Sequence, residues 1–233
     1  MKKQDGYNLI ELMIALTMGL IIIAATITIY ISTIKASADI IKSARLNHDL
    51  DSAMALMVND IRRAGYWGEA MVGTESSENP FTEAGTDFQI LSPSCVLYAY
   101  DADADGDVDI NGKEHFGFRL SDGNIQMRFS NIDCNSNGWN VLNVNEGGEQ
   151  VEVTVLTFSP SYKCLRKRAD VADLSYNTSC DVADTAGYIV AGDRVIETRE
   201  ITITMAGRVK KDPAVTKNIM AHVKIRNDRV FVK

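Results

Sequence analysis

Residues 6–34, GYNLIELMIALTMGLIIIAATITIYISTI, decide the fold of this chain, because they place one acidic side chain before a long apolar run. Leu12 to Ile34 are 23 residues without a formal charge. In a helix such a run spans about 34 Å, close to the hydrocarbon thickness of a bilayer, and it therefore predicts a membrane span. Lys2 and Lys3 precede the run, so the positive-inside rule predicts a cytoplasmic start and an exported remainder. Glu11 needs a partner, because an acidic group at membrane depth costs about 3 kcal/mol.

The helix is expected to continue beyond the apolar run as an amphipathic segment. Apolar residues recur at helical spacing and line one face: Ile40, Ala44, Leu50, Met54, Met57, Ile61 and Ala64. Gly65 follows them, as glycine commonly does at a helix C-terminus. We expect one helix over residues 7–64, about 87 Å long. Its second part should lie against a domain through Met54, Met57 and Ile61.

The stretch GYNLIELMIAL resembles the leader junction of type IV pilins and type II secretion pseudopilins. The resemblance implies that prepilin peptidase cuts between Gly6 and Tyr7 and that the new terminus is N-methylated. It also implies that Glu11 meets the free amino terminus of an adjacent subunit. Such a pair would set the register of the subunits, because either charge alone is costly in lipid. Asn8 and Glu11 also fit a capping box at a helix start.

Three further stretches are similar to the PilW family of minor pilins: LDSAMALMVNDIRRAGYWG, CVLYAYDADADGDVDINGKEHFGFRL, and the end from ITITMAGR to HVKIRNDRV. The resemblance implies a non-enzymatic minor pilin that helps to prime and assemble type IV pili with other minor and major pilins. It implies a single-pass inner-membrane protein with a periplasmic domain, which enters the pilus, and it leaves open whether the position is at the tip or in the shaft. Thr28 stands where many major pilins have proline, which favours a minor pilin or a pseudopilin.

Two alternatives to the minor pilin stay open on the sequence. One is a minor pseudopilin of a type II secretion system, which would share the leader junction. The other is an exported calcium-dependent adhesin or binding module that uses a pilin helix only as its anchor. Deletion separates them, since loss of pili supports the pilin role and normal pili with lost attachment support the adhesin.

Beyond Gly65 the sequence predicts short β-strands separated by turns. The stretch HFGFRLSDGNIQMRFS (115–130) is the clearest hairpin, and a second is expected from about 197–208 and 217–232 around Asp212-Pro213. The expected fold is α+β and pilin-like, with one long helix packed on a mainly antiparallel sheet domain. The expected parts are a leader (1–6), the membrane half of the helix (7–34), its amphipathic half (35–64) and a β-rich exported domain (65–233).

The four cysteines all lie beyond the membrane run: Cys95, Cys134, Cys164 and Cys180. An even count there suits two disulfides in an oxidising compartment, with three pairings possible. Order along the chain favours Cys95 with Cys134 and Cys164 with Cys180. The sequence has no CxxC motif and no Cys/His cluster with the spacing of a zinc site.

The stretch DADADGDVDING (101–112) is typical of a calcium-binding loop. Alternate acidic residues followed by Gly106 match the start of an EF-hand loop, in which carboxylates converge on one hard cation. The twelfth position is Gly112, so the bidentate ligand expected there comes two residues late. The expected Ca²⁺ ligands are Asp101, Asp103, Asp105, Asp107, Asp109 and Glu114. The alternative is a solvated acidic loop.

Charge and motif content exclude two broad function classes. A net charge of −7 argues against general nucleic-acid binding, which needs clustered Lys and Arg. The three histidines lie far apart and no GxSxG, HExxH or glycine-rich phosphate-binding motif occurs, so we expect no enzyme. Residues 65–111 carry no basic side chain, whereas 194–233 carry ten Lys and Arg against four acids. These regions could attract each other within or between subunits, or both could be solvated.

Overall fold

The structure, a computed structural model, describes residues 8–68, 79–109, 112–142, 151–168 and 172–233. The chain divides into two compact units, one up to Arg45 and one from Leu46 to Lys233. Helix α1 (Leu9–Ile61) contributes residues to both units. The processing site expected at Gly6 and Tyr7 lies outside the described residues.

In the first unit, α1 has the length and the apolar composition needed to cross a membrane. It begins after Asn8, whose carbonyl accepts the amides of Glu11 and Leu12 at 2.9 and 3.2 Å. Hydroxyls within the apolar run donate back to the helix, as Thr28 does to the Ala24 carbonyl at 2.8 Å. The Thr28 hydroxyl therefore has a hydrogen-bond partner within the helix, as a hydrocarbon environment requires.

The C-terminus of α1 is at Ile61 rather than at the expected Ala64. The chain tightens there, because the amides of Arg63 and Ala64 donate to the carbonyls of Asp60 and Ile61 at 2.9 and 3.1 Å. These are bonds of the 3₁₀ type, which commonly close a helix. Gly65 follows with a φ of 71°, so its expected place at the helix terminus is confirmed.

In the second unit, α1 buries one stripe of apolar side chains at helical spacing. The stripe consists of Leu46, Leu50, Met54, Met57 and Ile61. The predicted contact of the helix with the domain is therefore confirmed. The expectation for Ile40 and Ala44 is wrong, since both are exposed, Ile40 at 69%. They precede Leu46, where the core cluster of the domain begins.

The first sheet is an antiparallel meander of five strands. In order they are β1 (Gln89–Ser92), β2 (Cys95–Ala99), β3 (His115–Ser121), β4 (Asn124–Arg128) and β5 (Asn140–Val141). The hairpin expected over 115–130 is confirmed, with Ser121 opposite Asn124. Asp122 and Gly123 form its turn with φ of 52° and 74°. Two positive φ values fit the turn type that matches the twist of paired strands.

The second sheet is built around β8 (Arg194–Val209). β6 (Val151–Lys167) runs antiparallel along one side of it and carries the short β7 (Leu174–Tyr176) on its outer edge. β9 (Asp212–Lys224) and then β10 (Arg229–Val232) follow one another along the other side of β8. The second expected hairpin is therefore present as β8 and β9.

The prediction that one strand continues to Val232 is wrong, because β9 ends at Lys224 and β10 begins only at Arg229. The segment between β9 and β10 forms hydrogen bonds with the residues that follow α1. The Arg226 amide donates to the Arg62 carbonyl at 3.2 Å. The Asn227 side chain donates to the Ala64 carbonyl at 3.1 Å. The carbonyls that a helix leaves unpaired at its C-terminus thus find donors in a distant segment.

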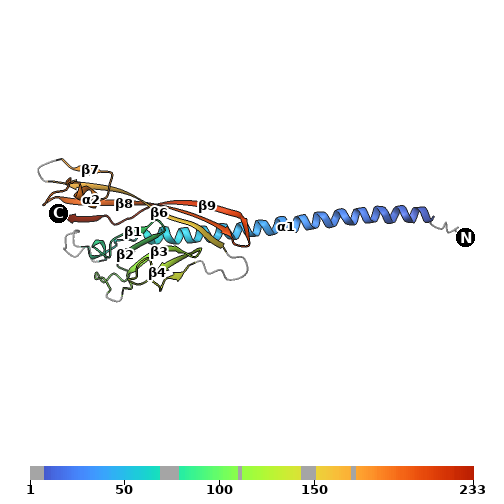
Figure 1. The fold of residues 1–233 in the computed structure, drawn as a ribbon, viewed down its shortest axis with the longest axis horizontal. Helices are drawn as coiled ribbons and strands as arrows, with labels where there is room; N and C mark the ends of the chain where they lie inside the picture. The colour runs from blue at the N-terminus through green and yellow to red at the C-terminus, as the bar shows by residue number, and fades with distance from the viewer. Residues whose placement is uncertain (1–7, 69–78, 110–111, 143–150, 169–171) are drawn as a thin grey trace. The chain divides into compact units, whose positions relative to one another are not determined.

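The two sheets lie on either side of the second-unit part of α1 (Figure 1). One core cluster joins Leu50 and Met57 of the helix to Phe118 of the first sheet and Ile203 of the second. Each such fully buried side chain contributes about 1.5–3 kcal/mol. Gly207 lets β8 approach the helix, because a Cβ there would lie 2.9 Å from a Leu50 methyl. The α+β fold expected from the sequence is confirmed.

Two disulfides tie strands of this domain to segments that follow them in the chain, and their pairing is the one that chain order favours. Cys95 of β2 is bonded to Cys134, and both pack against Trp139. Cys164 of β6 is bonded to Cys180, the first residue of α2 (Cys180–Thr185). Closing a loop of 16 residues, as the second does, contributes about 3 kcal/mol by restricting the unfolded chain.

Candidate functional site

The acidic loop that follows β2 is held against the residues at the end of α1. The Asp101 amide donates to the Tyr66 carbonyl at 2.9 Å. In return, the Trp67 indole donates to the Gly106 carbonyl at 2.9 Å. Gly68 allows the close approach, because a Cβ there would lie 2.9 Å from the Cα of Ala104. The sequence reasoning missed this role of GYWG, although two glycines around paired aromatic residues were a signal of close backbone contact.

Two buried carboxylates organise the backbone of the loop. Asp101 is 1% exposed and accepts three amides, from Ala104 at 2.6 Å, Gly68 at 2.8 Å and Gly106 at 3.0 Å. Glu114 is 3% exposed and accepts the amides of Ala102 at 2.7 Å and Asp109 at 2.9 Å. Donors of this kind stabilise buried carboxylates.

The loop brings together three of the six expected calcium ligands. Oxygens of Asp101, Asp103 and Glu114 lie within 4.8 Å of one another. Asp105 and Asp107 lie outside this group, as does Asp109. The Asp105 carboxylate instead accepts the Asp107 amide at 3.0 Å.

Glu114 reaches the group because the chain turns at Gly112, which has a φ of 71°, before β3 begins. Glu114, which comes two positions too late for an EF-hand loop, therefore lies close to Asp101 because of this turn. The sequence motif identified the loop, whereas that turn determines which of its carboxylates lie close together.

Electrostatics make this group of carboxylates unfavourable by itself. Burial raises the pKa of Glu114, and the charges of Asp101 and Asp103 raise it further, against the lowering effect of its two backbone amides. A raised pKa means that ionised Glu114 lowers folding stability above its normal titration range. A hard cation bound to the three carboxylates would remove this cost, which is the chemistry that the arrangement can perform.

Next to the loop, the end of α1 is fixed to the first sheet by a polar cluster. Asp60 accepts the hydroxyls of Tyr98 and Tyr100. Arg63 stacks on the Tyr100 ring, 4.0 Å from its centroid, and donates to its hydroxyl at 3.2 Å. Burial first, and then the charge of Asp60, raise the pKa of both tyrosines, which therefore stay neutral donors.

The expected assembly residue, Glu11, lies in the first turn of α1 and is exposed. It belongs to the first unit, whose apolar side chains are exposed around the helix, among them Leu9 at 73%, Ile21 at 68% and Tyr30 at 67%. Such a surface needs a covering of lipid or of other helices.

Residues 39–225 match a family model described as prepilin peptidase-dependent protein B. The matched region excludes the leader junction and the apolar run, so it is independent of the residues that first suggested a pilin. It includes the end of α1, the acidic loop and most of both sheets. Neither a curated protein nor a solved structure matches the chain.

Proposed function

The chain belongs to the family of prepilin peptidase-dependent protein B, and on that premise we propose that it is a minor pilin of the PilW type that helps to prime and assemble type IV pili. The observation that carries this proposal is the exposed apolar part of α1, continuous in one helix with a part that packs into a domain. In a soluble enzyme this apolar surface would be exposed to water at a cost, whereas a filament subunit buries it first in lipid and then among equivalent helices.

In this proposal prepilin peptidase cleaves after Gly6 and the new Tyr7 terminus is N-methylated. The helix anchors the protein in the inner membrane with its domain in the periplasm, until other minor and major pilins take it into the pilus. The two disulfides support an oxidising compartment for the domain. Assignment to PilW rests on the resemblance of DIRRAGYWG and the two other stretches.

Glu11 would register neighbouring subunits by pairing with the methylated terminus of the next chain. Glu11→Ala is therefore expected to leave cleavage and membrane insertion intact and to reduce the number of pili at least tenfold, because the amino terminus would enter lipid unpaired. Glu11→Asp keeps the charge and is the matched control, expected to restore most of the pili. Electron microscopy of sheared pili, with immunoblots of membranes, measures both. Normal piliation of the Glu11→Ala strain would remove the charge-pair argument.

A deletion strain separates the proposed role from its alternatives. Loss of pili supports the minor pilin. Normal pili with failed protein secretion would identify a pseudopilin of a type II secretion system, and normal pili with lost attachment would identify an adhesin on a pilin anchor.

Calcium binding by Asp101, Asp103 and Glu114 is the second part of the proposal. Millimolar Ca²⁺ should raise the melting temperature of the full chain in detergent by roughly 3–5 °C, since binding at ten times Kd stabilises by about 1.4 kcal/mol. Asp103→Asn should abolish the rise. Asp105→Asn, on the same loop but outside the converging group, should keep it. No rise in the wild type, or an equal rise in Asp103→Asn, would leave a solvated acidic loop.

A further inference from the structure

A cleft of about 600 Å³ opens between the end of α1, the acidic loop and the break after β9. Its basic wall consists of Arg62, Arg63 and Arg226, joined by the amides of Asn59 and Asn227. Asn59 lies in the last turn of α1, and Arg62 and Arg63 lie in the turn that directly follows Ile61.

The fold brings together the two chain segments that carry these arginines. The Arg226 amide donates to the Arg62 carbonyl at 3.2 Å, which ties the break to the helix end. Arg63 is oriented by its stacking on Tyr100. Favourable interaction with the negative end of the helix dipole explains arginines at positions 62 and 63, but it does not explain Arg226, which comes from another segment.

Several side chains of the basic wall have hydrogen-bond donors without a protein partner within the described ranges of the chain. Among the residues that the structure describes, the side chains of Arg62, Arg226 and Asn59 have neither an ion-pair nor a hydrogen-bond partner. Arginine presents five donors in a planar fork that matches a carboxylate. Two such forks beside a free amide present donors whose geometry suits carboxylate groups.

The opposite wall of the cleft is weakly acidic. Asp101 lines it, but its carboxylate is buried and turned to three backbone amides, so Asp103 is the acidic side chain presented at the surface. Three arginines against two carboxylates, those of Asp101 and Asp103, leave the lining of the cleft with one net positive charge, in a chain whose net charge is −7. The cleft is therefore a local attractor for anions on an otherwise acidic protein.

We propose that this cleft binds the carboxylate side chains of an acidic peptide segment on a partner protein. The side-chain amide of Asn59 suits the peptide groups that accompany those carboxylates, whereas the Asn227 amide already donates to the Ala64 carbonyl. Asp103 disfavours inorganic phosphate, because repulsion grows with the charge of the anion. The site goes beyond the assembly role of α1, since it lies wholly within the second unit and uses neither Glu11 nor the apolar run.

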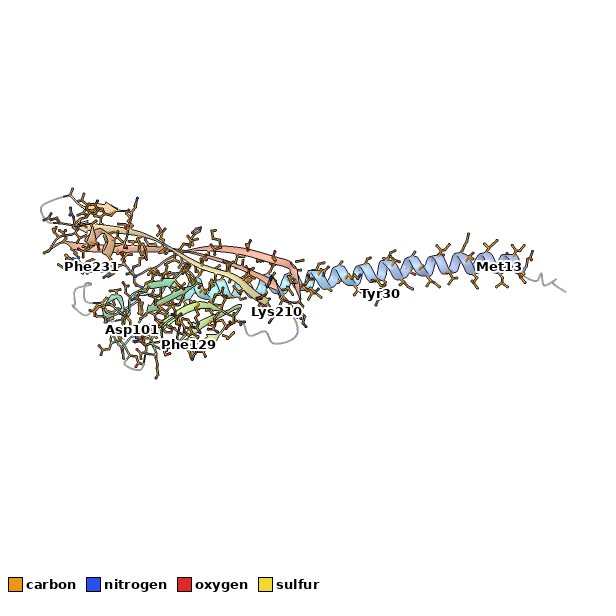
Figure 2. The ribbon with its side chains drawn as sticks, in the orientation of Figure 1. Met13, Tyr30, Asp101, Phe129, Lys210 and Phe231 are labelled. Atoms are coloured by element: carbon orange, nitrogen blue, oxygen red, sulfur yellow. A yellow bond between two sulfur atoms is a disulfide. The ribbon has the colours of Figure 1, made fainter. Side chains whose placement is uncertain are left out.

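The test is fluorescence anisotropy of full-length protein in detergent and in calcium-free buffer with a chelator, so that Asp103 carries its charge, with a labelled Gly-Glu-Glu-Gly peptide and with Gly-Gln-Gln-Gly as its neutral counterpart. The double variant Arg62→Gln with Arg226→Gln should raise the Kd for the acidic peptide at least tenfold, the loss of about one charged hydrogen-bonded pair. Asp103→Asn should lower that Kd about two- to threefold by removing repulsion. Lys210→Gln is the matched control, because Lys210 lies at the opposite end of the domain from Asp101 (Figure 2), and it should bind as the wild type does.

Saturable binding of the acidic peptide, lost in the double variant and strengthened in Asp103→Asn, supports the proposal. Circular dichroism of each variant shows that its fold is retained. The proposal is overturned if the neutral peptide binds as well as the acidic one, or if the double arginine variant and Lys210→Gln bind the acidic peptide equally well. Inorganic phosphate and free glutamate are also added as competitors. Displacement of the peptide by phosphate at lower concentrations than by glutamate would likewise overturn the proposal. A normal binding result in a Glu11→Ala background separates this site from the assembly role.

Discussion

Replacing Arg199 by leucine is expected to lower the free energy of unfolding by about 3–5 kcal/mol, the cost of leaving a buried charge unpaired. Arg199 is 4% exposed and contacts Glu197, itself 3% exposed, with 2.9 Å between Nε and Oε1. Its NH1 group donates to Asp87 at 2.6 Å. Glu197 also accepts the amide of Cys180, so loss of the arginine would leave two carboxylates facing each other beside the second disulfide.

The matched control is Arg208→Leu, on the same strand. Arg208 pairs with Glu152 at 2.8 Å, but 41% of its side chain is exposed. Such a surface pair contributes at most about 1 kcal/mol. Urea unfolding of the full chain, followed by circular dichroism, measures both variants. Equal losses would show that the Arg199 network does not carry the stability assigned to it.

The second large effect is expected at the leader junction, where Gly6→Ala should abolish processing. The family resemblance implies a peptidase that accepts glycine on the leader side of the cleaved bond, and a methyl group there would block the close approach that glycine permits. The uncut chain would keep Lys2 and Lys3, whose charge holds the start on the cytoplasmic side. It would therefore stay in the membrane and out of pili.

Gly19→Ala is the matched control for this variant. Gly19 lies within the apolar run of α1, and a Cβ there would meet nothing within 4 Å. The same chemical change should leave cleavage unaffected, and alanine favours a helix over glycine by about 1 kcal/mol. Immunoblots of membrane fractions separate the cut and uncut forms. Normal cleavage of Gly6→Ala would contradict the assigned junction.

Local patterns in the sequence predicted the elements whose causes are local. The stripe from Leu50 to Ile61 follows from helical period, and the hairpin at Asp122-Gly123 follows from a turn that needs two positive φ values. The same period misled at Ile40 and Ala44, because periodicity shows that a face is apolar without showing where a domain begins to cover it.

The remaining parts of the site depend on contacts between distant segments, which no local pattern contains. Trp67 bonds to Gly106, and Asp60 bonds to Tyr98 and Tyr100, across long sequence separations. The acidic and basic regions do attract each other within one chain, since Asp87 pairs with Arg199 and lies 3.7 Å from Arg229. Composition alone could not predict these ion pairs, because they depend on which strands of the sheet lie next to the segment that carries Asp87.

The most direct test of the assembly role is the intact mass and the amino-terminal sequence of the protein purified from membranes. The account predicts a chain that begins at N-methylated Tyr7 and has lost residues 1–6. Non-reducing peptide maps of the same sample should contain the Cys95–Cys134 and Cys164–Cys180 pairs. The small residues Ala36, Ser37 and Ala38 faintly resemble a signal peptidase site. A terminus near Asp39 would therefore mean removal of the apolar run as a secretory signal, and would contradict the helix anchor, the pairing of Glu11 and the pilus role together.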